Sequence, residues 1–167
     1  MKIIFIHLLN DFSGSPKVLS QIVKSYKNKN HDVELFTSKD EGFLSNIVDK
    51  HHNFFYKRFE NKFLTLFSYI LSQVHLFFKI LFSKSNIVYI NTLLPFGAAL
   101  GAKISKKEVI YHIHETSIKP NILKKFLRYI VSITASKIIF VSNDLAQKEK
   151  FENKKSFVIH NALENSF

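Results

Sequence analysis

The chain alternates short, continuously apolar runs with longer segments whose apolar residues recur every three or four positions. Runs such as 86–91 (NIVYIN) and 137–142 (KIIFVS) lack a polar face, which is typical of strands covered on both sides. This alternation predicts right-handed crossovers and an α/β fold: a Rossmann-like, doubly wound parallel sheet of about seven strands with helices on both faces. We expect strands at 2–7, 32–37, 52–56, 86–91, 108–113, 137–141 and 155–159, and helices at 16–29, 42–50, 61–83, 95–105, 119–134 and 143–151.

The helix expected at 16–29 has clear start signals. Ser15 can accept a hydrogen bond from a free amide of the first turn, and Pro16 suits the first helical position. Apolar residues then recur at helical spacing and form one face, which comprises Val18, Leu19, Ile22, Val23 and Tyr26. The pattern predicts a helix that packs on the sheet through this face.

The most apolar window, 63–82, is long enough for a membrane-spanning helix, but Gln73, His75 and Lys79 interrupt it. Its polar residues recur at steps of three and four and form one stripe. The stripe comprises Thr65, Ser68, Ser72, His75 and Lys79. A largely buried helix, or one lying on a membrane surface, is therefore favoured over a transmembrane helix.

Composition adds three constraints. The 167 residues suit one domain, and a content of 46% hydrophobic residues is that of a folded chain. The 24 Lys and Arg against 13 Asp and Glu favour an anionic partner, although many of these lysines could simply solvate the surface. Nucleic acid is disfavoured because the aromatic residues lie mostly within the apolar patterns. The absence of cysteine excludes disulfides and thiolate metal sites, and fits a cytoplasmic protein.

The loop at 8–19 follows the first expected strand, where ligands of doubly wound sheets bind. It brings Ser13, Gly14 and Ser15 to a helix N-terminus, which favours an anion or a sugar hydroxyl. The alternative is a tight turn with a cap and no ligand. A single glycine does not make a G-x-G-x-x-G fingerprint, and no P-loop motif occurs. These absences argue against a nicotinamide or flavin enzyme and against a P-loop kinase.

The segment 111–117 (YHIHETS) carries the densest polar chemistry. His112 and His114 share a face if the strand persists, and Glu115 and Thr116 follow. Two histidines and a glutamate could bind zinc, but the spacing nominates no third reliable ligand, so we expect no metal. In one interpretation His112 is an internal strand residue and His114 begins a loop. In the other, His114 emerges at the carboxyl edge of the sheet and hydrogen-bonds a sugar or phosphate.

Two further polar positions end expected strands. Asn91 and Thr92 follow one apolar run, and Ser142 follows another. Because the carboxyl ends of parallel strands share one edge, these side chains are candidates for donor or acceptor binding. Ser142 could instead only cap the following helix.

Taken in order, five segments resemble the N-terminal half of a family 4 glycosyltransferase of the GT-B architecture. The loop 13–19 (SGSPKVL) resembles the glycine-rich first loop of that family. The segments 85–104 and 108–117 are similar to its strand and small-residue helix and to its "VIYTVHE" strand end. The segments 137–147 and 157–164 resemble its "IIAVSEALA" and "VIPNGVD" motifs. Ser13 stands in place of the first loop glycine, and His160 in place of the proline.

The resemblance implies retaining sugar transfer from a nucleotide-sugar, of hexosyltransferase type and without a metal cofactor. It makes His114 the candidate catalytic residue, because the family histidine at this strand end contacts the donor sugar. It places Gly14 near the donor phosphate and the acceptor. The N-terminal half mainly shapes the acceptor side, for a bacterial polysaccharide or a lipid-linked glycan.

The resemblance also implies a missing C-terminal domain, which would bind the nucleotide and would have to be supplied in cis or in trans. We therefore expect residues 1–167 to be a single Rossmann-like domain that transfers no sugar alone. Phe55, Lys57, Arg58 and Lys62 form a basic aromatic segment that could hold the chain on an anionic membrane surface, on the inner face of the cell membrane. The alternative function is a non-catalytic subunit that anchors to a membrane or binds a partner protein.

Overall fold

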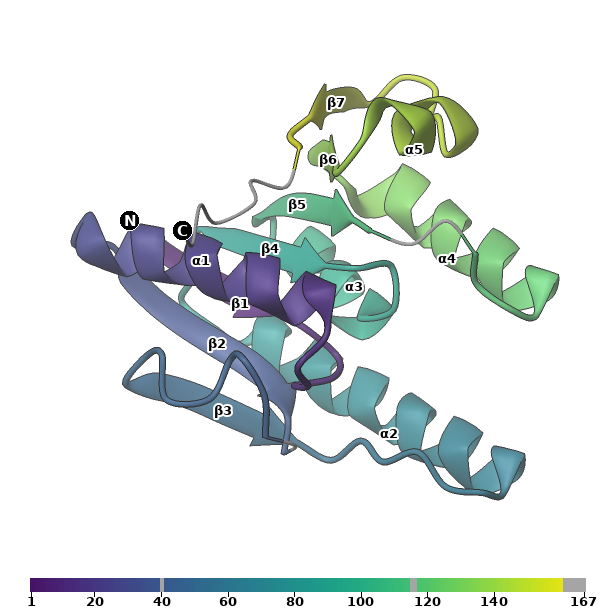
Figure 1. The fold of residues 1–167 in the computed structure, drawn as a ribbon, viewed down its shortest axis with the longest axis horizontal. Coiled ribbons are helices and arrows are strands. Elements are labelled where there is room, and N and C mark those ends of the chain that lie inside the picture. The colour runs from purple at the N-terminus through teal and green to yellow at the C-terminus, as the bar shows by residue number, and fades with distance from the viewer. Residues whose placement is uncertain (40, 115–116, 161–167) are drawn as a thin grey trace, which may run out of the picture.

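The computed structural model describes residues 1–39, 41–114 and 117–160. Seven strands form one sheet in the order β3-β2-β1-β4-β5-β6-β7, and every pairing is parallel (Figure 1). The predicted fold class is confirmed. The strands are β1 (Lys2–Ile6), β2 (Asp32–Ser38), β3 (Lys50–Phe54), β4 (Ile87–Asn91), β5 (Glu108–Ile113), β6 (Lys137–Phe140) and β7 (Lys155–Val158). The helices are α1 (Gly14–Asn28), α2 (Lys62–Leu81), α3 (Phe96–Ile104), α4 (Asn121–Thr134) and α5 (Asn143–Lys148).

Helices cover both faces of the sheet, because alternate residues of the central strands point to opposite sides. Ile3 and Phe5 pack under α1, which crosses in front of the sheet in Figure 1. Ile4 and Ile6 pack in the second core, which α2, α3 and α4 close from the other side. Both faces of β1 are therefore buried, as its continuous apolar sequence predicts.

The helix predicted at 42–50 is wrong, because the segment forms turns up to the start of β3. The side chain of Asn10 holds it: Asn10 Oδ1 accepts from the amide of Leu44 at 3.0 Å. Asn46 has a φ of 56°, which interrupts helical geometry. Leu44 and Val48 are nonetheless buried under the same face as α1. These two residues are four positions apart, as in a helix, but here they are two buried residues that anchor a loop.

The start of α1 also differs from the prediction. The helix begins at Gly14, so Ser15 is its second residue and does not cap it. The side chain of Asp11 organises the turn instead, since Asp11 Oδ1 accepts from the amide of Ser13 at 3.0 Å and from its hydroxyl at 2.5 Å. Ser13 occupies the N-cap position, but its side chain is engaged with Asp11 and caps no helix amide.

The long helix α2 packs on the domain through a side that carries both polar and apolar residues. Ser68, Ser72 and Gln73 are buried, although the first two belong to the polar stripe predicted along this helix. Within the described ranges, α2 is the one helix long and apolar enough to cross a bilayer. Its contacts with α3 place it in the helix layer of the domain. It is not largely buried, because six of its 20 residues are buried, and a position on a membrane surface stays a prediction.

Candidate functional site

The order of the strands reverses between β1 and β4, and the polar residues that follow these strands meet there. His7 follows β1, Asn91 ends β4, and His114 follows β5. Parallel pairing brings the three positions to one edge, because β1 pairs with β4 and β4 pairs with β5. We call His7, Asn91, His112 and His114 the histidine cluster.

Asn91 is the centre of the histidine cluster. Its Nδ2 donates to the main-chain carbonyl of Ser15 in α1 at 3.2 Å, which fixes the orientation of the amide. Asn91 Oδ1 therefore faces His114 Nε2 at 2.9 Å, and that ring nitrogen carries the proton. Asn91 thus joins the start of α1 to the end of β5, and Gly14 and His114 lie on the same rim, as the sequence predicts.

His7 lies on the other side of Asn91. Its Nδ1 is 3.1 Å from both the main-chain carbonyl and the side-chain Nδ2 of Asn91. With a proton on Nδ1 the ring donates to the carbonyl, and without one it accepts from the amide. Either tautomer holds the end of β1 against the end of β4.

His112 is an internal strand residue, as one of the two interpretations of the sequence states. It is buried, and Tyr89 OH lies 2.9 Å from its Nδ1. His112 and His114 do share a face, because their ring centroids are 4.2 Å apart. The ring of His112 therefore packs against the ring of His114, and His114 reaches the edge of the sheet.

Thr92, directly after β4, is strained. Its φ is 84°, in the left-handed region that a β-branched residue rarely adopts. Its amide donates to the carbonyl of His112 at 2.8 Å, which holds it there. Among the described residues its buried Oγ1 has no hydrogen-bond partner. Strain of this kind is concentrated at functional sites.

Burial keeps the ring of each histidine in the cluster neutral. It lowers the pKa of His7 and of His112 to about 4. It lowers the pKa of His114 to about 3, with a smaller contribution from the neighbouring His112 and His7. Near neutral pH the rings are therefore hydrogen-bonding groups without charge.

We expect acid to destabilise the fold through these histidines. Unfolded histidine has a pKa of about 6.5, so the unfolded chain takes up protons that folded His7 does not. The free energy of unfolding that depends on the neutral ring of His7 is at its full value above pH 6.5. It decreases as the pH falls from 6.5 towards 4. For His7 the loss amounts to about 3 kcal/mol. Urea unfolding measured from pH 7 to pH 4 tests this.

A matched pair of variants isolates the contribution of His7 from that of the carboxylates. His7→Asn keeps a polar atom near the Nδ1 position and should flatten the pH dependence. His52→Gln changes a half-exposed side chain on β3, outside the histidine cluster, and serves as the matched control. Parallel pH profiles for wild type and His7→Asn would contradict the assignment.

Gly14 is the one glycine of the four that packing against the described residues does not require. A Cβ at Gly42, Gly97 or Gly101 would lie 2.0–2.5 Å from main-chain atoms of a neighbouring segment. A Cβ at Gly14 would meet nothing within 4 Å. The open space lies at the N-terminus of α1, beside the Ser15 carbonyl that Asn91 contacts. It leaves room for a ligand to approach the main chain closely, as the sequence predicts.

The other predicted site residues have mixed outcomes. Ser142 Oγ accepts from the amide of Leu145 at 3.1 Å, so it caps α5, and no observation assigns it to a ligand. Glu115 and Thr116 lie outside the described residues. Phe55, Lys57, Arg58 and Lys62 are exposed beside the start of α2, so they are available to a partner. No group of three metal-binding side chains occurs among the residues that the structure describes, and the absence of a metal cofactor stays a prediction.

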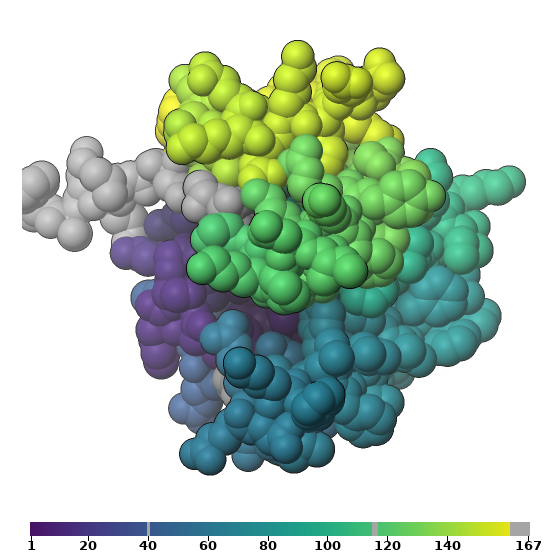
Figure 2. Space-filling model, turned by 90° about the vertical axis from the view of Figure 1, so that its right-hand side faces the viewer, coloured from purple at the N-terminus to yellow at the C-terminus, as the bar shows by residue number. Residues whose placement is uncertain are grey.

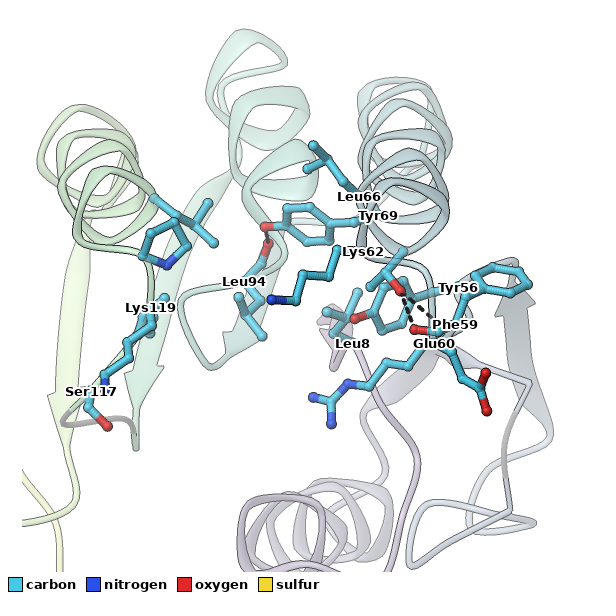
Figure 3. A pocket seen from close by; sticks show the side chains of 15 residues that line it. Leu8, Tyr56, Phe59, Glu60, Lys62, Leu66, Tyr69, Leu94, Ser117 and Lys119 are labelled. Carbon is cyan, nitrogen blue, oxygen red and sulfur yellow. Dashed lines mark hydrogen bonds between the residues drawn. The ribbon is translucent and has the colours of Figure 1, made fainter.

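A pocket of about 700 Å³ opens between the starts of α2 and α4. Figure 2 shows the hollow between the two helices, with the segment that follows β1 at its base. In Figure 3, Tyr56, Phe59 and Lys62 lie on the α2 side, and Ser117 and Lys119 on the opposite side. Tyr69 closes the back and donates its hydroxyl to the carbonyl of Leu94 at 2.6 Å. Apolar walls, three cations (Arg58, Lys62 and Lys119) and one carboxylate, Glu60, give the pocket an amphipathic character with a net positive charge.

Sequence reasoning missed His7 and the central role of Asn91. His7 ends an apolar run and has no polar neighbour in the sequence that marks it. The available signal was its place: a polar residue directly after the first strand of a doubly wound sheet lies at the switch point. The pocket was also missed, because it combines segments that are far apart in the sequence, from Leu8 to Leu123.

The sequence profile of Glycosyltransferase Family 4 matches residues 12–166. The chain belongs to glycosyltransferase family 4. The match covers the first loop, the histidine cluster from Asn91 onward and the strands that follow, and it confirms the resemblance of the separate motifs. No protein with curated annotation is similar enough in sequence to match the chain.

Solved structures share the fold at low identity. HepE of Anabaena, solved with UDP, superposes with a TM-score of 0.72 at 18% identity over 98% of this chain and 44% of its own. The lipopolysaccharide outer core galactosyltransferase WaaB superposes with 0.69 at 19% identity, over 98% and 46%. MurG of Acinetobacter baumannii gives 0.69 at 10% identity, over 98% and 47%. The family 4 chain thus spans less than half the length of these structures and has the fold of a GT-B N-terminal domain.

Proposed function

We propose that the chain is the acceptor-binding half of a retaining glycosyltransferase, which moves a sugar from a nucleotide-sugar to a lipid-linked glycan or a polysaccharide. The observation that carries this proposal is the hydrogen-bonded link from Ser15 through Asn91 to His114 at the switch point of a family 4 domain. The UDP in the HepE structure and the description of WaaB as a galactosyltransferase support a nucleotide-sugar donor.

In this proposal His114 acts as a neutral hydrogen-bonding group towards the donor sugar. Because its pKa is low, the ring does not take up a second proton at neutral pH and is a poor general acid. Its hydrogen bond to Asn91 fixes the orientation of the ring. The open space at Gly14 and the N-terminus of α1 suit a phosphate, because a helix N-terminus favours negative charge. The proposal assigns no role to a metal ion.

The pocket between α2 and α4 is the acceptor site in this proposal. It begins at Leu8, directly after His7, so it opens beside the histidine cluster. A free glycan needs many hydroxyl partners, whereas these walls are largely apolar. Arg58, Lys62 and Lys119 can bind a phosphate. The lining therefore favours a glycan joined to a lipid through a phosphate, presented on the cytoplasmic face of a membrane.

A synthetic acceptor tests the proposal: glucose joined through a phosphodiester to a decyl chain. We expect calorimetric titration to show binding that weakens at least tenfold when the phosphate is removed, as in decyl glucoside. Lys62→Gln should weaken binding of the phosphodiester by a similar factor, because it removes a cation of the pocket. Lys24→Gln, which changes an exposed lysine in the C-terminal half of α1, serves as the matched control.

With UDP-glucose and the same acceptor, the chain alone should transfer no sugar. Transfer without an added partner would contradict the assignment as half of a catalytic unit. Absence of binding to the phosphodiester would instead favour the alternative, a non-catalytic subunit that anchors to a membrane or binds a partner.

A further inference from the structure

The helix α2 buries polar residues together with apolar ones, such as Leu76 and Ile80, and exposes a largely apolar outer side. Ser68, Ser72 and Gln73 are each at most 2% exposed. Five large apolar residues at helical spacing form a stripe on the outside, which we call the α2 stripe. Its members are Phe63, Phe67, Ile70, Val74 and Phe78, with exposed fractions of 84%, 61%, 49%, 49% and 52%. A helix of a water-facing surface has the opposite arrangement.

Close packing on α3 fixes this orientation. A Cβ at Gly97 would lie 2.0 Å from the carbonyl oxygen of Gln73, and one at Gly101 would lie 2.5 Å from that of Phe77. The two helices therefore touch backbone to backbone, and only small side chains fit between them. A rotation of α2 that buried the α2 stripe would push phenylalanine rings into this contact.

Hydrogen bonds hold the same orientation. Gln73 Oε1 accepts from the amide of Gly97 at 3.0 Å, which satisfies a donor at the start of α3. Gln73 Nε2 donates to Ser72 Oγ at 3.0 Å, and Ser72 Oγ donates to the carbonyl of Tyr69 at 2.6 Å. Ser72 and Gln73 are thus hydrogen-bonded inside the domain, and the α2 stripe remains on the outside.

The charges around the α2 stripe are mostly positive, and the exception next to α2 is the exposed Glu60. The helices α2, α3 and α4 contain no Asp or Glu, and they carry Lys62, Lys79, Lys103, Lys124, Lys125 and Arg128. Glu149 of the segment after α5 pairs with Lys124 and Arg128, at the α4 side. Lys62 and Lys79 are exposed at the two ends of the α2 stripe, and Lys57 and Arg58 precede it. An apolar stripe between cations matches the surface of a bilayer that contains anionic lipids.

We propose that α2 docks the chain on an anionic bilayer, lying in the plane of the membrane with the α2 stripe in the boundary between headgroups and acyl chains. Lys57, Arg58, Lys62 and Lys79 then contact lipid phosphates. Twenty helical residues extend about 30 Å, so a single helix in this plane gives a long, narrow contact. A second copy of the chain is a poorer occupant, because two stripes facing each other would bring two sets of cations together.

This docking deepens the function proposed above and rests on it for its purpose. Leu66, half exposed on α2, and Lys62 both line the acceptor pocket. A bilayer in contact with the α2 stripe would therefore lie next to the mouth of the pocket, where a lipid-linked acceptor could enter without leaving the membrane.

Sedimentation with vesicles tests the docking without any sugar or nucleotide. We expect the chain to sediment with vesicles of phosphatidylglycerol and phosphatidylcholine in equal parts, and at least tenfold less with phosphatidylcholine alone. The triple variant Phe67→Ser, Ile70→Ser, Val74→Ser should lower the partition coefficient at least tenfold. These side chains are exposed, so circular dichroism should show an intact fold.

Matched controls lie on α1 and on the residues directly before and after it. Phe12→Ser removes an apolar side chain that is 74% exposed, and Lys24→Gln with Lys29→Gln removes two exposed cations. Neither should change sedimentation. Equal binding by wild type and the triple variant would overturn the proposal, as would no binding of the wild type to anionic vesicles. A dimer in solution that the triple variant abolishes, without vesicle binding, would assign the stripe to a second copy. Failure of docking leaves the binding of the soluble acceptor intact, so the two proposals fail separately.

Discussion

Replacing Gly97 with valine is expected to lower the free energy of unfolding by about 3 kcal/mol or more. The new Cβ would lie 2.0 Å from the carbonyl oxygen of Gln73 and 2.7 Å from its carbonyl carbon. These are main-chain atoms of α2, which cannot move aside as a flexible side chain can. The helices α2 and α3 must separate, and the bond from the Gly97 amide to Gln73 Oε1 breaks.

The control for this change is the same substitution at Gly14, where a Cβ would meet nothing within 4 Å. Gly14→Val should change the stability by less than about 0.5 kcal/mol, because it touches no packed atom. Urea unfolding monitored by circular dichroism measures both variants. Similar stabilities for the two would show that the contact between α2 and α3 is looser than described.

Replacing Asn91 with alanine is expected to lower the free energy of unfolding by about 3 kcal/mol, the second-largest effect. Asn91 is fully buried, and its amide bonds to His114, His7 and the carbonyl of Ser15. Each partner would keep a polar atom in a site from which water is largely excluded. Asn86→Ala is the matched control, because Asn86 is exposed and its side chain accepts one bond, from the amide of Lys2.

A conservative change at the same position separates the effect of charge from the effect of lost packing. Asn91→Asp keeps the shape and an oxygen towards His114 but puts a negative charge beside two buried rings. It should raise the pKa of His114 from about 3 and that of His7 from about 4. Nuclear magnetic resonance titration of the ring protons measures both values. Unchanged values would contradict the central position of Asn91.

The sheet could be predicted because its signals are local. Continuous apolar runs such as Ile87–Asn91 require cover on both faces, and their alternation with helical segments leaves few topologies. The shared face of His112 and His114 follows from the two-residue period of a strand. The position of Gly14 follows from the rule that ligands bind at the carboxyl ends of the strands.

The errors arose where side-chain contacts that the periodicity does not reveal decide the local structure. Asn10 holds the segment after β2 in turns, and Asp11 sets the start of α1 ahead of Ser15. The polar stripe of α2 was recognised by its helical spacing, which does not tell which side of the helix faces inward. That side is chosen by Gly97 and Gly101, more than 20 residues further along the chain.

The backbone contact between α2 and α3 has a consequence for which acceptors could be used. Since α2 cannot turn or slide on α3, a chain docked through α2 would hold His114 at one constant height above the lipid phosphates. A sugar attached directly to the lipid and a sugar at the tip of a long glycan stand at different heights. The domain would then act as a ruler that selects acceptors by the number of sugars already attached.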